Sequence, residues 1–300
     1  MTDITINAQA GRPWVGPMMV LGGGIAIGFA PIGLRLGLDD LGPQAIAFWR
    51  YAFAAPVLFL LVFLFEKRPP RVPNKYILLG GICFTIDIAL WHWSLTLTSV
   101  SNSTFLVNLG NICVGFAAWV FLRERPAKAW FIAIGLALAG AAALSLGGQQ
   151  GGQGSITGDV IAIGAAVMVS FYLLASKLAR RSLGGLETVF WLTLVEVGAG
   201  SLVVLVAGET FLPADLSGFS APLFLGIGVH VIGQGLIITG LGRTPTAIAG
   251  ILVLIQPVIA AAVSWQLFNE SLTVLQAGGS TLILVAVWLA QRGRRVQAID

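Results

Sequence analysis

The chain has 300 residues, of which 57% are hydrophobic and 10% are charged, and its mean hydropathy is +0.90. Because soluble domains carry about 25% charged residues, this composition excludes an ordinary soluble enzyme or nucleic-acid-binding domain. The net charge of +4 does not point to nucleic acid, because the basic residues are distributed by loop along a hydrophobic chain. Long apolar runs without the alternation of barrel strands predict an all-α integral membrane protein that contacts the lipid bilayer.

Ten membrane-spanning helices are predicted, since each crossing needs about 20 apolar residues. Short connections with turn-forming residues separate the runs, so none of them can hold a soluble domain. The first eleven residues are polar and lack the features of a cleaved signal peptide, so we expect the first apolar run to stay in the membrane. The predicted spans are residues 14–37, 43–65, 76–98, 101–122, 128–147, 158–180, 187–208, 219–241, 246–268 and 273–291.

One segment occurs twice in the chain. Residues 106–124 align without a gap with residues 252–270, and the same register continues upstream. A slightly different offset relates Phe48-Trp49 to Phe190-Trp191, as expected if loop lengths drifted after a duplication. The matched residues are Leu106 and Leu252, Val107 and Val253, Trp119 and Trp265, Glu124 and Glu270, Leu79-Gly80 and Leu225-Gly226, Leu95 and Leu241, and Thr98 and Thr244.

The orientation of the two halves follows from their charges, because Lys and Arg are retained on the cytoplasmic side of a membrane. With the N-terminus inside, every Lys and Arg except Arg35 and Arg50 lies in an inner loop or near a terminus. Both termini are therefore predicted to be cytoplasmic. Residues 1–147 and 158–300 form two five-helix halves, joined by a Gly/Gln-rich periplasmic linker over 148–157. Since five is odd, the second half is inverted, as in many secondary transporters with alternating access.

Specific motifs accompany this architecture. Each half has an Asn- or Gln-containing helix that runs into the pattern W-x-x-L/F-x-E, and the first copy ends in Leu122-Arg123-Glu124-Arg125-Pro126. Over about residues 14–292 the chain resembles the EamA-type members of the drug/metabolite transporter superfamily. With Trp91-His92-Trp93 in its third span, it is most similar to the YddG aromatic amino acid exporters. The resemblance implies efflux of aromatic and other amino acids across the inner membrane, without a nucleotide or metal cofactor.

Two charged residues are predicted to lie deep in the bilayer, where ionisable groups are costly and mark candidate sites. Arg50 is about seven residues into the second span, and Asp87 is about eleven residues into the third span from the other side, so their depths overlap. They form either a structural ion pair or a site at which a substrate group replaces one partner. Trp91 shares the helix face of Asp87, whereas His92 lies about 140° away.

The second half contributes further polar candidates. Glu196 lies near the middle of the seventh span, and His230 and Gln234 are four residues apart on the eighth. Glu196 and His230 could relay a proton, since histidine titrates near physiological pH, or His230 could be a hydrogen-bonded interior residue. Tyr172 belongs to a group of deep aromatic residues that either line a cavity or face lipid.

Amide side chains form the last group of candidates. Asn108 and Asn111 lie on a polar face of the fourth span, and Gln256 lies on the related ninth span. Amides in hydrocarbon need partners, which are either neighbouring helices or a zwitterionic substrate. The predicted substrate-binding residues are Arg50, Asp87, Trp91, His92, Asn108, Asn111, Tyr172, His230, Gln234 and Gln256.

The leading hypothesis is an exporter of amino acids or similar small metabolites. An exporter of cationic drugs or nucleotide-derived metabolites is the alternative, and a channel or scaffold stays open. A membrane-embedded enzyme is disfavoured, because Asp87 is the only Asp deep within a predicted span and the chain has no HExxH and no GxxxxGK[ST]. We expect no cofactor and no nucleic acid partner. The sequence leaves the oligomeric state open, and a monomer is one option.

Overall fold

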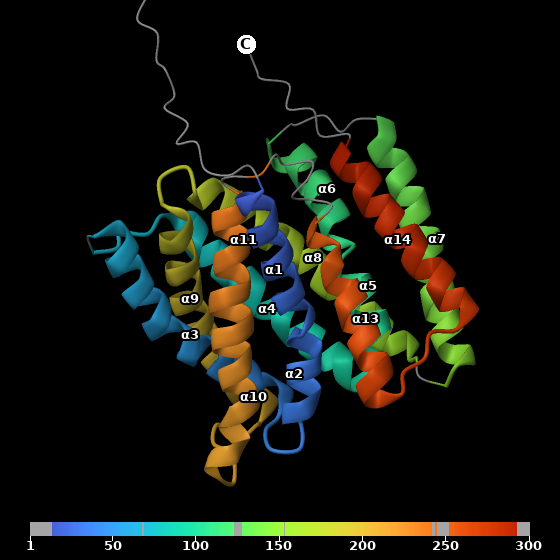
Figure 1. Cartoon of the computed structure of the whole chain (residues 1–300), viewed down its shortest axis with the longest axis horizontal. Helices are drawn as coiled ribbons and strands as arrows, with labels where there is room; N and C mark the ends of the chain where they lie inside the picture. The colour runs from blue at the N-terminus through green and yellow to red at the C-terminus, as the bar shows by residue number, and fades with distance from the viewer. Residues whose placement is uncertain are drawn as a thin grey trace, which may run out of the picture.

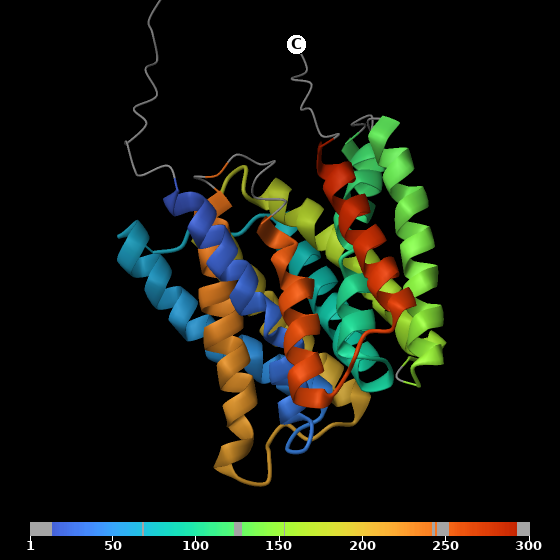
Figure 2. The same ribbon diagram turned by 45° about the vertical axis from the view of Figure 1, so that its right-hand side comes forward.

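The computed structural model describes residues 14–67, 69–122, 128–152, 154–241, 244 and 252–292. Within these residues all regular secondary structure is helical, and the helices lie side by side in one bundle (Figures 1 and 2). The elements are α1 (Val15–Gly28), α2 (Ala30–Gly37), α3 (Pro43–Glu66), α4 (Lys75–Leu97), α5 (Val100–Val107), α6 (Gly110–Leu122), α7 (Lys128–Gln150), α8 (Ile156–Ala179), α9 (Gly185–Ala207), the 3₁₀-helix η1 (Leu216–Phe219), α10 (Ser220–Leu223), the π-helix η2 (Phe224–Gly233), α11 (Gln234–Leu241), α13 (Ile255–Phe268) and α14 (Val274–Arg292).

Eight helical segments of the described residues are long and apolar enough to cross a membrane. Each lies on one of the first eight predicted spans, which confirms an all-helical membrane protein. The helices α13 and α14 are shorter apolar helices on the ninth and tenth predicted spans. The ninth predicted span covers residues 246–268, of which residues 246–251 lie outside the described residues. The ten-span topology therefore stays a prediction.

Several spans that were expected to be continuous are interrupted. The first is divided at Phe29, where Pro31 in the first turn of α2 lacks a backbone N–H. The fourth is divided at Asn108-Leu109 into α5 and α6. In the eighth, the π-helix η2 replaces two turns or more of α-helix, a local change that is frequent at functional sites.

The linker is shorter than the predicted range 148–157. The helix α7 continues to Gln150, and α8 begins at Ile156 directly after Ser155. A turn at Gly152, with φ of +70°, follows α7, and glycine adopts this left-handed conformation without steric cost. The hydroxyl of Ser155 accepts a hydrogen bond from Gly158 N at 3.4 Å and so caps α8. Both ends of the predicted linker are therefore helical.

Four helix pairings dominate the packing of the bundle. The helix α4 packs along α8, α1 along α11 and η2, α3 along α9, and α7 along α14. Small residues allow close backbone approach, as is common between membrane helices. A Cβ atom on Gly140 of α7 would lie 2.8 Å from Gly279 O of α14, and a Cβ on Gly279 would lie 2.6 Å from Gly140 O.

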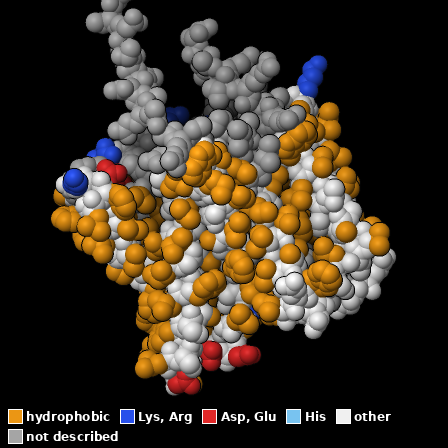
Figure 3. All heavy atoms as spheres, in the orientation of Figure 1, with side chains coloured by type: hydrophobic (Ala, Val, Ile, Leu, Met, Phe, Trp, Pro, Cys, Tyr) orange, Lys and Arg blue, Asp and Glu red, His pale blue; other side chains and the backbone are white. Residues whose placement is uncertain are grey.

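Most charged side chains on the surface of the bundle lie near one of its two ends. On the face seen in Figure 3, Lys and Arg lie at the end where α1 begins, acidic side chains gather near α10, and hydrophobic side chains cover the region between. We call these the basic end and the acidic end. Described residues near the basic end include Lys67, Arg71, Lys75, Lys128, Lys177, Arg180 and Arg181, and those near the acidic end include Asp39, Asp40, Glu209, Asp215 and Glu270.

Candidate functional site

A group of ionisable residues is buried in the middle of the bundle. Arg50 on α3, Asp87 on α4, Glu196 on α9 and His230 on η2 have between 1% and 3% of their surface exposed. They come from four helices that pack against one another: α3 against α9 and η2, and α4 against α3 and α9. The central cluster comprises Arg50, Tyr51, Asp87, Tyr172, Thr193, Glu196 and His230.

His230 holds a central position in this cluster. Its Nε2 atom lies 2.8 Å from the Thr193 hydroxyl and 3.7 Å from Glu196 Oε2. The ring of Tyr51 is edge-on to the imidazole, with centroids 5.7 Å apart. Phe84 lies beside the cluster, with its ring 6.3 Å from the imidazole and 4.5 Å from the ring of Tyr172. The polar groups are therefore bordered by aromatic rings.

Arg50 lies close to both carboxylates without a direct ion pair. The guanidinium interacts electrostatically with Asp87 and Glu196. Among the described residues, neither carboxylate comes within 4.0 Å of it. The sequence left open an ion pair between Arg50 and Asp87 or a substrate site at this position, and in the structure the two side chains interact electrostatically without a contact within 4.0 Å.

Several polar atoms of the central cluster are buried without a hydrogen bond to any of the described residues. Two of them, Nε and Nη1, belong to Arg50. The others are Tyr51 Oη, Asp87 Oδ1, Glu196 Oε2 and His230 Nδ1. A buried charge without partners costs several kcal/mol, so a polar ligand that satisfied these atoms would bind favourably. One guanidinium suits a carboxylate, and two carboxylates suit an ammonium group.

Trp91 and His92 lie toward the acidic end from the cluster. His92 is fully buried, and its Nδ1 donates a hydrogen bond to Pro43 O at 2.9 Å. Gln44 Nε2 donates to Ala89 O at 3.1 Å, so the two bonds hold the start of α3 against α4. The ring of Trp91 is 5.6 Å from that of His92. A structural role for His92 explains these contacts.

The amide candidates do not join the central cluster. Asn108 Nδ2 donates to Thr104 O at 2.8 Å, and Asn111 Nδ2 donates to Asn108 O at 3.2 Å, so both amides satisfy the break between α5 and α6. The backbone of Gln256 lies against α1, because its main-chain carbonyl oxygen is 2.9 Å from the position that a Cβ atom on Gly28 would take. Gln234 is partly buried and begins α11, after the π-helix has changed the helix phase.

Two members of the cluster were not predicted from the sequence, Tyr51 and Thr193. Both are uncharged, so the rule that ionisable groups mark sites did not select them. A search for polar residues one helix turn from the ionisable ones would have found Thr193, three residues before Glu196 on α9. Tyr51 directly follows Arg50, and no helix-face argument links neighbours in sequence.

A second buried polar network is structural. Asp159 accepts hydrogen bonds from the Thr98 hydroxyl at 2.9 Å and from Asn102 Nδ2 at 3.2 Å. Gln276 Nε2 donates to Asn102 Oδ1 at 2.9 Å. Asp159 is buried in the first turn of α8. Its oxygens are satisfied, so this network joins α5, α8 and α14 without calling for a ligand.

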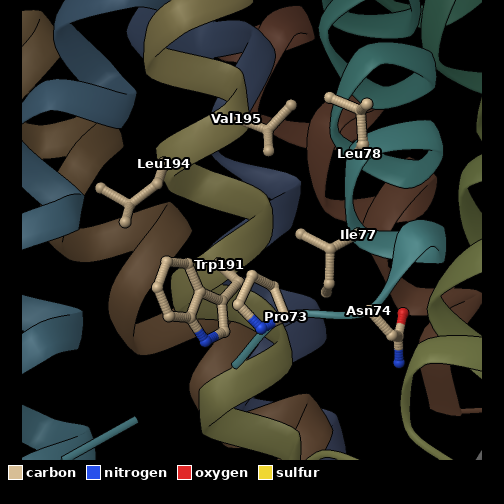
Figure 4. A pocket seen from close by; sticks show the side chains of 7 residues that line it. All are labelled: Pro73, Asn74, Ile77, Leu78, Trp191, Leu194 and Val195. Atoms are coloured by element: carbon tan, nitrogen blue, oxygen red, sulfur yellow. The ribbon is translucent and has the colours of Figure 1, made fainter. Parts of the chain in front are cut away.

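An apolar hollow of about 330 Å³ lies apart from the cluster, between the starts of α4 and α9. Figure 4 shows side chains of both helices around it. Leu78 and Leu194 are largely exposed there, so the hollow opens on the outer surface. Its lining is Pro73, Asn74, Ile77, Leu78, Trp191, Leu194 and Val195, and it includes no residue of the central cluster. Among the described residues, no group of three or more His, Cys, Asp or Glu could hold a metal ion.

Comparisons with known proteins agree with a transporter fold. The model of the EamA-like transporter family matches residues 14–146 and 156–291. Two proteins of Bacillus subtilis (strain 168) are similar: the uncharacterized transporter YetK, 24% identical over 253 residues (80% of this chain and 76% of YetK), and the uncharacterized transporter YwfM, 23% identical over 279 residues (87% and 88%). A solved crystal structure described without a function has a TM-score of 0.65 at 18% identity, covering 94% of this chain and 99% of that one.

Proposed function

This chain belongs to the EamA-like transporter family, and from that premise we propose that it exports aromatic and other amino acids across the inner membrane by alternating access. The family and both relatives point to a transporter and not to an enzyme. The proposal includes ten spans in two inverted halves, both termini in the cytoplasm, and a site between the halves. The single observation that carries it is the central cluster, whose unpartnered buried charges come from both halves.

Reciprocal contacts support the inverted repeat. An offset of 146 residues aligns Gly80 with Gly226, and the offset of 142 that aligns Trp49 with Trp191 also aligns Arg50 with Leu192. A Cβ on Gly80 would lie 2.9 Å from the Leu192 side chain, and a Cβ on Gly226 would lie 2.8 Å from Arg50 O. The two contacts exchange when the halves are exchanged, as an approximate two-fold axis requires.

Aligned tryptophans make a second reciprocal pair of contacts. Trp49 Nε1 donates to Phe211 O at 2.5 Å, and Trp191 Nε1 donates to Arg71 O at 2.8 Å. Each indole thus binds the backbone of the loop that follows the partner helix, α9 in one case and α3 in the other. Matching roles at opposite ends of the bundle are expected of two halves with opposite orientation.

The cluster lies where related residues of the two halves meet. Phe84 and His230 are aligned by the offset of 146, and their rings meet edge-on with centroids 6.3 Å apart. Two residues related by a two-fold axis contact each other only near that axis. Transporters with inverted repeats bind substrate near the midplane at the interface between the repeats, which supports the central cluster as the substrate site.

The chemistry of the cluster suits an aromatic amino acid. Arg50 would bind the α-carboxylate, and Asp87 and Glu196 would bind the α-ammonium group. Phe84 and Tyr172 would contact an aromatic side chain through stacking or edge-to-face packing. Two carboxylates beside one guanidinium also favour a second cargo, an organic cation without a carboxylate. The two candidates differ in what Arg50 does, since a guanidinium attracts a carboxylate and repels a cation.

Uptake into liposomes that carry the purified protein tests the proposal. Labelled tryptophan, phenylalanine, threonine and lysine are compared, with and without a pH gradient. We expect saturable uptake that prefers the aromatic amino acids, and Arg50→Gln should weaken it about tenfold or more because a charge-assisted contact is lost. The matched control Gln234→Ala, outside the cluster, should leave it unchanged. Flux equal to empty liposomes for all four would reject amino acids, and faster uptake of an organic cation by Arg50→Gln would favour the second cargo.

A further inference from the structure

An ion pair closes the acidic end of the bundle. Arg35 on α2 pairs with Glu270, which follows α13. Arg35 Nη2 also donates to Thr98 O at 2.8 Å and to Leu95 O at 3.2 Å, and the guanidinium lies 5.5 Å from the ring of Phe268. The second carboxylate oxygen of Glu270 accepts from Val100 N at 2.9 Å.

This set of bonds connects the two halves of the chain. Arg35, Leu95 and Thr98 belong to the first half, and Glu270 belongs to the second. Both charged side chains are mostly buried, with 21% and 8% of their surfaces exposed. Because several bonds meet on each charge, the pair contributes more to closure than an exposed surface ion pair would. Separation of the halves at this end has to break the bonds that Glu270 makes with Arg35 and with Val100 N.

Packed side chains fill the path between the pair and the central cluster. On α4, Ile88, Trp91 and Leu95 follow Asp87 toward the acidic end and are buried. Leu34 of α2 lies in the same hydrophobic core as these three side chains, and Val263 and Phe268 of α13 pack against that core. At a rise of about 1.5 Å per residue, Leu95 lies about 12 Å along α4 from Asp87. The acidic end is therefore closed by about two helix turns of apolar packing, with the ion pair beyond it.

We propose that Arg35 and Glu270 are the gating residues of the acidic end, which hold it closed while the central cluster is reached from elsewhere and separate when cargo passes. The inference rests on the proposed alternating access, and it does not depend on the identity of the cargo. Neither residue touches the central cluster, so the pair acts on the path and not on cargo recognition. In two-state terms, loss of the pair shifts the population toward the state that is open at this end.

Labelling of a reporter cysteine tests this gate without any cargo. Cys83 and Cys113 are replaced by Ala, and Ile88→Cys places a thiol next to Asp87, where a membrane-impermeant maleimide is applied from each side in turn. We expect Arg35→Gln and Glu270→Gln to raise the labelling rate from the acidic end about tenfold, as for loss of charge-assisted bonds. Arg35→Lys keeps the positive charge, so its labelling rate should stay nearer that of the wild type.

Asp215→Asn is the matched control, because it removes a charge at the same end from a residue whose hydrogen bonds are to Ser217 in its own turn. It should leave the labelling rate unchanged. Unchanged labelling in both Arg35→Gln and Glu270→Gln would overturn the gate. A second test is independent of those variants: Arg35→Cys with Glu270→Cys is cross-linked by oxidation. The gate requires that cross-linking stop the flux of any transported cargo and that reduction restore it, and flux that survives full cross-linking would refute it.

Discussion

Arg50 is a buried cation with two carboxylates nearby, and its role depends on the angular position of each side chain. Sequence predicts its depth in the membrane, because residue counting along a helix measures distance from the membrane surface. The sequence did not show which faces of α3 and α4 meet, because these faces depend on how α9 and η2 pack beside the two helices. Glu196 came close to Arg50 for the same reason, from a helix more than a hundred residues away.

Two substitutions in the central cluster compare a hydroxyl that makes a hydrogen bond with one that makes none to the described residues. Thr193→Val removes the hydroxyl that lies 2.8 Å from His230 Nε2 and should cost about 1 kcal/mol, because a buried imidazole nitrogen loses its partner. Tyr51→Phe removes a hydroxyl without a protein partner and should leave the melting temperature unchanged. Thermal unfolding of both variants in detergent measures the difference. An equal loss in both would mean that the Tyr51 hydroxyl is bonded in the folded protein.

Among the elements, the ends of helices show how one half stabilises the other. The helix α3 begins after Gly42, which has no side chain to cap it. Glu209, from the loop after α9, accepts hydrogen bonds from Gln44 N at 2.9 Å and Ala45 N at 2.8 Å. The carboxylate thus replaces a local N-cap. Sequence could not identify this bond, because the partners are more than 160 residues apart and no local pattern links them.

The Glu209 cap makes a prediction about pH. Burial raises the pKa of Glu209 above its ordinary value of 4.5 and outweighs the two backbone N–H groups, which lower the pKa. Because the folded pKa is the higher one, this residue's contribution to stability is complete below pH 4.5 and declines as pH rises through the folded pKa. At pH 7, Glu209→Gln, which keeps one acceptor oxygen, should be as stable as the wild type or more stable. Glu209→Ala should lose about 1 kcal/mol, as for loss of a cap.

Melting temperatures between pH 4 and pH 8 measure this effect. The wild type should show the decline with rising pH, and Glu209→Gln should lack that component. Asp215 should show the opposite dependence of stability on pH. Its hydrogen bonds to Ser217 lower its pKa, so the small contribution of this exposed residue to stability is lost as pH falls. A Glu209→Gln protein that is much less stable than the wild type at pH 7 would contradict the dominance of burial.

The contact of α7 with α14 gives a third prediction. Gly140→Ala would bring a methyl group within 2.8 Å of Gly279 O, so the two helices must move apart, at a cost of about 1–3 kcal/mol. Gly135 is on the same helix, and a Cβ there would meet nothing within 4 Å. Gly135→Ala should therefore be neutral or stabilising by about 0.5–1 kcal/mol through helix propensity. Thermal unfolding compares the two, and similar losses in both would exclude tight α7–α14 packing as the cause.

Helix phase explains why Gln234 lies apart from the central cluster. His230 and Gln234 are four residues apart and would share a face of an α-helix. The π-helix η2 ends between them, so only His230 joins the cluster. Hydrophobic runs predict the existence of a helix well, whereas a π-helix or a break such as Asn108-Leu109 leaves no mark in hydropathy. The polar residues at those breaks are consequently the least predictable part of the site.

At the scale of the whole molecule, the duplication was the most informative sequence feature. Four matched residues between 106–124 and 252–270 were enough to divide the chain, and the family model matches two segments with nearly the same division. The charges of the two ends could also be read from the loops. The gate could not, because Arg35 was only an exception to the positive-inside pattern until the fold brought it to Glu270.

The repeat extends the gate to a prediction about the basic end. The offset of 142 aligns Arg35 with Lys177, which lies in the last turn of α8. The offset of 146 aligns Leu95 and Thr98, the carbonyl partners of Arg35, with Leu241 and Thr244. If both halves use the same device, Lys177 stabilises closure of the basic end. Lys177→Gln should then favour the state that is open at the basic end.

This change has the opposite sign to that of Arg35→Gln. In the Ile88→Cys reporter, Lys177→Gln should raise the labelling rate from the basic end and lower it from the acidic end, because one two-state equilibrium governs both. Arg180→Gln is the matched control, since it removes a neighbouring charge from the same end, and it should change neither rate. A Lys177→Gln protein that labels faster from the acidic end would show that the aligned cations do not act on opposite ends, and the symmetry of the gates would fail even if Arg35 and Glu270 form one of them.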